Sequence, residues 1–323
     1  MNRHQVSKQQ ASQSTHAPSM VSVPLRKEAI MQSLKHVGGA SAFKVPDMPD
    51  VIMLLEREAN SRYPNARKFA EIIESNNVIT GEILSIVKSP TFLRHMTATV
   101  EVKTIGHVIS LIGIQKTYRL AVAAAIRSIP AQSTLFRSII DHSFDVAVAC
   151  AEIAGYVQGI DISDAYLFGL FRDAGAIGVA NSLQQKYDRY WYHLLSFPAS
   201  GPQLEEQELK IRHDYLGVVA ARQWGFGNGA GEGDMLLAIQ EHHNCQQVAH
   251  FANERVRLLV AIGLLAEVMV GEINAENYQA TEVEQVRSTA LDVLYLADDA
   301  KVLIRMNLLS MLIDRTTIYH LYC

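Results

Sequence analysis

Apolar side chains recur every three or four residues along most of the chain after Pro46, which is the spacing of one buried helical face. Residues that start or stop helices divide this pattern into segments. Asn65 and Thr104 occupy positions suited to N-caps, and Pro90 and Pro130 stand where helices must end. The pattern predicts helices over residues 66–75, 79–87, 104–112, 115–129, 135–157, 164–183, 203–224, 234–245, 248–270 and 281–309.

Strand patterns are weak in this sequence. β-branched residues cluster only over 97–102, a segment too short and isolated to build a sheet. Residues 1–43 are rich in Gln, Ser, His and Lys and lack a sustained apolar period, so we expect a flexible N-terminal tail. One short helix near residues 25–34 is compatible with that tail. The chain is therefore predicted to be all-α, as a two-lobed helical bundle.

The helix pattern also indicates how the chain is divided. We expect one helical domain over residues 44–270, with an N-terminal lobe over 44–130 and a second lobe over 131–270. The boundary is placed near Pro130, where one predicted helix ends. Residues 271–323 are expected to form a C-terminal helical extension.

The composition describes a chain that can bury a core. Of 323 residues, 49% are hydrophobic and 19% charged, which excludes general disorder. A net charge of −4 argues against nucleic-acid binding, because neutralising phosphates needs concentrated Lys and Arg. The most apolar stretch, 258–271, is short and carries Glu267, so we expect no membrane span, and no secretory signal is apparent. Cys150, Cys245 and Cys323 lie far apart without a CxxC spacing, which fits a reducing cytoplasm.

Residues that could bind a metal gather in the predicted second lobe. They lie in four short segments, 141–143, 172–175, 213–217 and 241–244. Imidazole and carboxylate groups on separate helices can converge in a bundle core and hold a divalent metal. Such a metal would activate water for attack on a phosphoester. The alternative is that these are ordinary polar residues, each satisfied by a hydrogen bond in a helical core.

These segments belong to a longer series of short motifs in a fixed order. The series comprises TGEIL at 80–84 followed by Lys88-Ser89, TIGHVISLIG at 104–113, DHS at 141–143, LFGLFRDAG at 167–175, HDYLG at 213–217, WGF at 224–226 and the pair His242-His243. Over about Pro46 to Val270 this order resembles the HDOD family, a branch of the HD-domain phosphohydrolase superfamily. The resemblance implies an HD-domain-like second lobe. Lys88-Ser89 stands where the family has an Asn-Ser pair.

Departures from the family pattern bear on the function that the resemblance implies. The His of the superfamily's metal-binding His-Asp pair is Arg172 here, and a guanidinium stays protonated and has no lone pair for a metal. The Lys that often follows in catalytic relatives is Ala176, and no Asp between His243 and Asp292 can supply the final ligand. The resemblance therefore implies a non-catalytic domain with no expected metal. The residues of its degenerate site or ligand cavity would be His142, Arg172, Asp173, His213, His242 and His243.

Arg172 suggests a specific hypothesis. Its guanidinium would stand in for the metal and lock the helices together through a carboxylate. Neighbouring residues on a helix do not face each other, so Asp145 or Glu241 on another helix is as suitable a partner as Asp173. Two alternatives are that Arg172 points to solvent, or that it binds a phosphorylated ligand together with His213.

The sequence thus predicts a bacterial-type, cytoplasmic signal-transduction protein without a cofactor. It would bind a regulatory protein partner or a small ligand such as a nucleotide or cyclic dinucleotide, and neither nucleic acid nor a membrane. Apolar helices after Gly271 could support a homodimer. The alternative is a metal-dependent phosphohydrolase or phosphodiesterase that uses His142, Asp173, His213 and His242 with a divalent metal.

Overall fold

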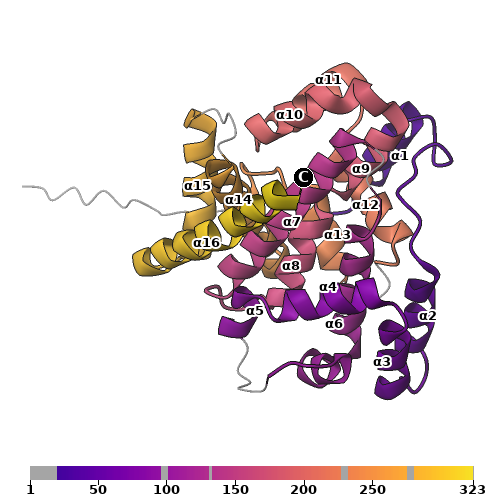
Figure 1. The fold of residues 1–323 in the computed structure, drawn as a ribbon. Coiled ribbons are helices and arrows are strands. Elements are labelled where there is room, and N and C mark those ends of the chain that lie inside the picture. The colour runs from indigo at the N-terminus through magenta and orange to yellow at the C-terminus, as the bar shows by residue number, and fades with distance from the viewer. Residues whose placement is uncertain (1–19, 96–100, 131–132, 227–231, 275–279, 323) are drawn as a thin grey trace, which may run out of the picture.

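The structure is a computed structural model that describes residues 20–95, 101–130, 133–226, 232–274 and 280–322. Within these ranges every regular element is a helix, and one isolated β-bridge pairs Val21 with Phe251 (Figure 1). The all-α prediction is confirmed.

The chain begins with α1 (Lys27–His36), and the elements then follow in two groups (Figure 1). The first group is α2 (Asp50–Ala59), α3 (Ala66–Glu74), α4 (Asn77–Val87), α5 (Pro90–His95) and α6 (Ile105–Arg127). The second group is α7 (Thr134–Ala154), α8 (Ile162–Phe171), α9 (Ala174–Leu183), η1 (Gln184–Tyr187), α10 (Asp188–Ser196), α11 (Gly201–Leu209), α12 (His213–Gln223), α13 (Glu232–Glu241), η2 (Val248–His250) and α14 (Glu254–Ile273). The C-terminal pair is α15 (Ala280–Leu294) and α16 (Asp298–Tyr322).

Helix starts in the first group follow the predicted caps. The Asn65 side chain accepts hydrogen bonds from the backbone N–H groups of Arg67 and Lys68, and Thr104 accepts one from His107. Both therefore satisfy backbone donors that a helix leaves free at its first turn. Gly113 interrupts α6 with a positive φ of 81°, at the position where the sequence predicted a helix end.

Four long predicted helices are each divided into two. The helix expected over 248–270 becomes η2 and α14. The other three, expected over 164–183, 203–224 and 281–309, become pairs of α-helices that are divided at Asp173, at Lys210 and at Tyr295. Lys210 and Tyr295 adopt left-handed φ angles of 57° and 50°, which end a right-handed helix. Neither position carries the Gly or Pro that usually marks such an end, so the apolar pattern runs through it.

Part of the expected N-terminal tail is packed. Residues 1–19 lie outside the described residues, but residues 20–43 contain α1 and cross the second group. The Val21 N–H donates to the His250 carbonyl at 2.7 Å, and Phe43 is fully buried against the backbone of Gly178. Burial of these apolar groups explains why the segment is not a free tail, which polar composition alone had suggested.

Helix α6 is the one helix among the described residues that is long and apolar enough to cross a membrane. In its most apolar window, 56% of the residues are buried inside the protein, where α2, α3 and α4 contact it. This is the environment of a core helix.

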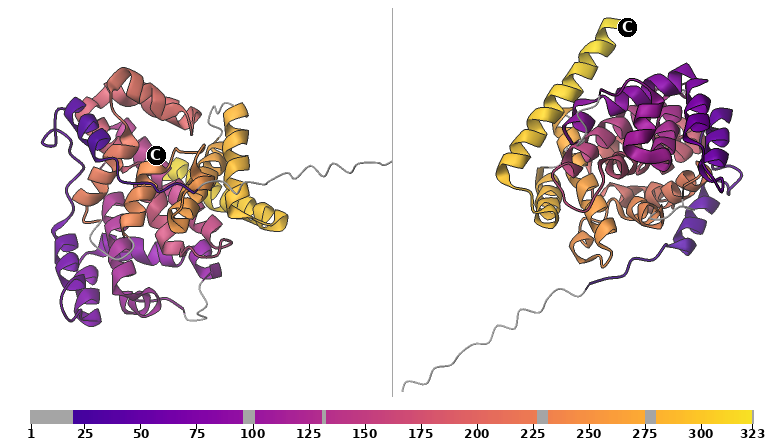
Figure 2. Two further views of the ribbon diagram at one scale, coloured as in Figure 1. Left: turned by 180° about the vertical axis from the view of Figure 1, so that it is seen from behind. Right: turned by 90° about the horizontal axis from the view of Figure 1, so that it is seen from below.

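Helix α7 lies at the centre of the second group and contacts α8, α9, α14 and α16. The C-terminal extension is helical, as predicted. Helix α15 packs on α14, and α16 runs along the body before its end projects from it (Figure 2).

Candidate functional site

The site depends on a close approach of α9 and α12. A Cβ atom added to Gly175 would lie 1.9 Å from the His213 carbonyl oxygen and 2.5 Å from the Gly217 nitrogen, so the two backbones touch at glycine. Asp173 precedes α9 and His213 begins α12, at the amino ends of the two helices. Contact at Gly175 therefore brings these two side chains together, because no side chain holds the helices apart.

Arg172 lies inside the protein, with 2% of its surface exposed, and does not point to solvent. Its Nε donates to Asp173 Oδ2 at 2.9 Å, its Nη1 donates to the Gly263 carbonyl at 3.2 Å, and its Nη2 donates to Glu267 Oε2. The guanidinium thus joins the end of α8 to α14 through Glu267 and the Gly263 carbonyl, and it makes ion pairs with both Asp173 and Glu267. Such a double ion pair compensates for the loss of water around a buried cation.

The partners of Arg172 differ in part from the expected ones. Asp173 can face its neighbour because the chain leaves helical geometry there, with φ −95° and ψ 10°. The partner from another helix is Glu267 rather than Asp145 or Glu241. Glu241 instead pairs with Arg26 at 3.0 Å.

His142 shares the same carboxylate. Its Nε2 lies 3.0 Å from Glu267 Oε2, and the Trp191 ring packs edge-on against its ring at 5.5 Å. His142, Asp173 and Glu267 form one group whose possible ligand atoms lie within 4.8 Å of one another. The Arg172 guanidinium hydrogen-bonds to one oxygen of each carboxylate in this group, so a cation already balances their charge.

A second group lies on the other side of Asp173. Asp173, His213, His242 and His243 each offer a ligand atom within 4.8 Å of the others, and all four are buried. His213 Nε2 lies 3.6 Å from Asp173 Oδ1, and His242 Nε2 lies 3.3 Å from the same oxygen. All six residues predicted for the degenerate site are thus brought together.

Glu205 on α11 holds one edge of this second group. Its Oε2 lies 2.7 Å from His213 Nδ1 and also accepts the His213 backbone N–H at 3.1 Å, while Tyr187 donates to its other oxygen. His213 Nε2 lies 3.0 Å from His243 Nε2, and His243 Nδ1 lies 2.6 Å from the Pro198 carbonyl. A carbonyl only accepts, so His243 carries its proton on Nδ1 and accepts from His213 at Nε2.

These buried groups differ in their protonation state at neutral pH. Burial would lower the pKa of His213, but Glu205 and Asp173 outweigh it and raise the pKa to about 10, so this imidazole is charged at neutral pH. Burial would raise the pKa of Asp173, but the charges of Arg172 and His213 hold it well below its usual range. The pKa of His243 is lowered, first by burial and then by the neighbouring histidines, which keeps it neutral.

In the second group, as far as the structure describes it, His242 has the one ring nitrogen without a hydrogen-bond partner. Its Nδ1 must donate to the Ile239 carbonyl at 2.7 Å, which leaves a lone pair on Nε2. That Nε2 atom is buried and has no hydrogen-bond partner among the described residues, although Asp173 lies 3.3 Å away without hydrogen-bond alignment. Two acceptors that face each other in this way favour a cation between them.

The two groups therefore differ in their fit to a metal. Around His142 and Glu267 a metal does not fit, because Arg172 binds one oxygen of each carboxylate and its fixed positive charge would repel the ion. Around His242 the donor set of one carboxylate and three imidazoles suits a divalent transition metal, provided that His213 loses its proton.

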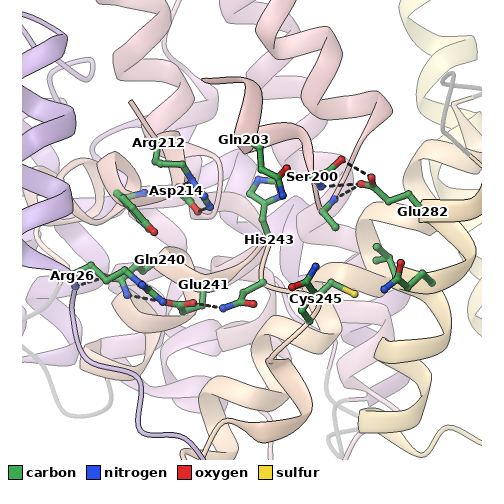
Figure 3. Close-up of a pocket in the computed structure, with 16 residues that line it drawn as sticks. Arg26, Ser200, Gln203, Arg212, Asp214, Gln240, Glu241, His243, Cys245 and Glu282 are labelled. Carbon is green, nitrogen blue, oxygen red and sulfur yellow. Dashed lines mark hydrogen bonds and ion pairs between the residues drawn. The ribbon is translucent and has the colours of Figure 1, made fainter. Parts of the chain in front are cut away.

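A polar cavity of about 340 Å³ opens beside the second group, and His243 lies on its wall (Figure 3). Arg26 with Glu241 and Arg212 with Asp214 form ion pairs on the cavity wall. On the opposite side, Glu282 of α15 accepts hydrogen bonds from the Ala199 and Ser200 backbone and from the Ser200 hydroxyl (Figure 3). The cavity thus connects the N-terminal segment, the histidine cluster and the C-terminal extension.

The contacts of two residues, Glu267 and Glu205, were not predicted from the sequence. Glu267 was visible as a lone charge in the apolar stretch 258–271, and a charge in such a stretch signals a buried partner. Glu205 lies in a Glu- and Gln-rich segment that resembles a solvated helix face, and nothing in its spacing distinguishes it.

Similar solved structures have the same fold. A provisionally named phosphohydrolase from Shewanella amazonensis SB2B has a TM-score of 0.57 and 17% identity, with 89% of this chain and 99% of that chain covered. An HDOD domain protein of unknown function from Geobacter sulfurreducens has a TM-score of 0.56 and 15% identity, covering 87% and 97%. A provisionally named signal transduction protein from Marinobacter aquaeolei VT8 has a TM-score of 0.53 and 14% identity, covering 89% and 67%.

A comparison with curated proteins found no match. The family model described as HDOD domain matches residues 45–245, which is more than half of the chain and agrees with the series of motifs found in the sequence. This chain belongs to the HDOD domain family.

Proposed function

We propose that the protein is a non-catalytic HDOD-type regulatory protein that acts by binding a partner. The observation that carries the proposal is the Arg172 guanidinium, which is paired with Asp173 and Glu267 at the position of the superfamily's metal-binding His. A fixed internal cation there stabilises the carboxylates that hydrolysis would need for a metal. It cannot polarise a water molecule into a nucleophile, because it offers no vacant coordination position.

The charge on His213 supports the same conclusion. Its protonated ring lies between Glu205 and Asp173, so the second group also balances its carboxylates with a cation of its own. The cluster is then a structural core that fixes the relative positions of α8, α9, α12, α13 and α14. A rigid scaffold of this kind suits a protein whose activity lies in its surfaces and cavities.

A metal-dependent phosphohydrolase is the second candidate, and the unpartnered Nε2 atom of His242 favours it. Asp173, His213, His242 and His243 would hold the ion, which would supply activated water. For that role His213 must give up its proton, and Glu205 would keep its ring oriented through Nδ1. Arg172 would remain a buried counter-charge to Asp173 and Glu267.

Metal content and turnover, measured together, separate the two candidates. Protein purified without a metal-affinity tag would be analysed by mass spectrometry for bound metals and assayed with bis(p-nitrophenyl) phosphate and cyclic dinucleotides. We expect no turnover above that of the Asp173→Ala variant, with or without added Mn²⁺. Metal-dependent turnover that Asp173→Ala and His242→Gln both abolish, in variants that keep their helical circular dichroism, would overturn the proposal.

The regulatory partner is proposed to be another protein or a small ligand in the cytoplasm. The polar cavity beside His243 is one place where such a ligand could contact both the domain and the C-terminal extension. Its described charged lining residues are Arg26, Arg212, Asp214, Glu241 and Glu282, so acids outnumber arginines. That excess of acidic residues argues against a nucleotide that binds there through its phosphates. We also propose that the C-terminal helices support a homodimer.

A further inference from the structure

A second cavity lies away from the histidine cluster, at the junction of α4, α5, α7, α8 and α16. Its volume is about 430 Å³, and none of the six predicted site residues lines it. The Phe92 and Tyr166 rings meet edge-on at 5.9 Å in its wall, beside Val148 and Ala151. A cavity of this size with mostly apolar walls is the usual form of a small-molecule site.

The two charged residues that line this cavity are both basic, although acidic groups lie behind its wall. Lys88 and Arg127 line it, and the described lining residues include no Asp or Glu. Arg127 is held in place by the Phe144 ring, 4.8 Å from its guanidinium carbon, and by Glu82, 3.5 Å from Nε. Lys88 follows the end of α4 and is exposed, so its ammonium can move toward a ligand. Lys88 is also the residue that replaces the Asn of the family's Asn-Ser pair.

The C-terminal helix forms part of the same cavity. Ser310 and Met311 of α16 line it. Next to them, Glu152 on α7 is fully buried and accepts hydrogen bonds from Thr91 and Asn307, each at 2.7 Å. This network ties α5 and α16 to α7, so a molecule in the cavity would contact α16 beside its attachment to α7.

We propose that this cavity binds a small anion with an apolar body, such as a carboxylate with an alkyl chain or aromatic ring of about eight to ten carbon atoms. The carboxylate would lie near Lys88 and Arg127, and the apolar body would pack against the wall formed by Phe92 and Tyr166. The charge at the rim and the apolar wall together select this class over neutral or cationic molecules of the same shape. The inference goes beyond the proposed function, because it assigns a ligand site outside the histidine cluster.

Three probes with the same alkyl chain and different head groups test whether the ligand must be an anion. Octanoate, octanol and octylamine would each be titrated into the full chain, with binding followed by saturation-transfer NMR and calorimetry. We expect octanoate to bind, and octanol and octylamine to bind at least about tenfold more weakly, since a charged hydrogen bond contributes roughly that factor. Equal binding of octanoate and octylamine, or no octanoate signal at millimolar concentration, would overturn the proposal.

Two variants locate the site. Lys88→Glu should weaken octanoate binding about tenfold. Lys35→Glu, which makes the same charge change at an exposed residue of α1, should leave it unchanged. Ser310→Trp should block the cavity from the exposed side of α16 and abolish binding without altering the core. Octanoate binding that survives both Lys88→Glu and Ser310→Trp would place the ligand elsewhere and refute the site. Neither result depends on the metal and turnover measurements.

Discussion

Replacing Arg172 with Ala is the sharpest test of the buried cluster. The substitution leaves two carboxylates, Asp173 and Glu267, without their shared cation in a region where each is about 3% exposed. Removing one partner of a buried ion pair typically costs about 3–5 kcal/mol, because the other charge stays buried and unpaired. Two charged hydrogen bonds, at about 1.5–3 kcal/mol each, give a similar sum.

The assay is urea unfolding followed by circular dichroism, supported by calorimetry. For a chain of this size we expect a fall in Tm of about 6–10 °C, on the basis of roughly 2 °C per kcal/mol. Arg67→Ala is the matched control, because Arg67 makes an ion pair with Glu71 while 90% exposed, and an exposed pair contributes little. Adding Glu267→Gln to Arg172→Ala should recover part of the loss, since it removes one of the unpaired charges.

A small change in the free energy of unfolding would refute this role of Arg172. If Arg172→Ala and Arg67→Ala both change the free energy of unfolding by less than about 1 kcal/mol, Arg172 does not hold the helices together. The absence of any recovery in the double variant would show that Glu267 is not the partner that matters.

Four further outcomes follow from the same geometry. Gly175→Ala should prevent stable folding or lower Tm by more than 6 °C, because its Cβ would overlap the His213 backbone. The control Gly81→Ala places its Cβ where no atom lies within 4 Å, so it should stabilise the protein by about 0.5–1 kcal/mol. Similar melting curves for the two variants would contradict the close approach of α9 and α12. The raised pKa of His213, about 10 against 6.5, means that its proton stabilises the folded state below pH 6.5 and that this contribution, at most about 5 kcal/mol, is lost as the pH rises toward 10. Urea unfolding from pH 6 to 10 should show the decline, and a slope unchanged in His213→Gln would refute it. Arg172→His should create an imidazole ligand beside Asp173, so that Zn²⁺ raises its Tm by several degrees more than that of the natural chain; equal shifts would mean that Arg172 does not exclude the metal. Glu282→Ala should remove the acceptor for the Ser200 and Ala199 N–H groups and lower the free energy of unfolding by about 1–2 kcal/mol, which chemical unfolding would detect. Unchanged hydrogen exchange in residues 280–294 would show that this contact does not hold α15.

The helices were predictable because their signals are local. Asn65 and Thr104 cap helices through their own next few residues, and Gly113 breaks α6 through its own φ angle. The divisions at Lys210 and Tyr295 were not predictable, since ordinary residues take left-handed angles there only because tertiary packing requires it.

The candidate site was also predictable only in part. Its six central residues were found because motif spacing places them on neighbouring helices, and the structure brings all six together. Glu205 and Glu267 were missed as partners because pairing over 8 and 95 residues depends on how whole helices pack. The pairing of Arg172 with adjacent Asp173 was left open beside a partner from another helix, because neighbours within a helix do not face each other. The structure allows it because Asp173 lies outside helical geometry, between α8 and α9.

Backbone contact between α9 and α12 at Gly175 has a mechanical consequence. Helices that meet through side chains can slide by exchanging rotamers, but two backbones in direct contact have no such freedom. Under the proposed function, a response to a bound partner must therefore leave this crossing intact and move the parts held by longer side chains. Helices α15 and α16 meet that condition, because Glu282 and Asn307 help to attach them, and we expect a signal to leave the protein through their displacement.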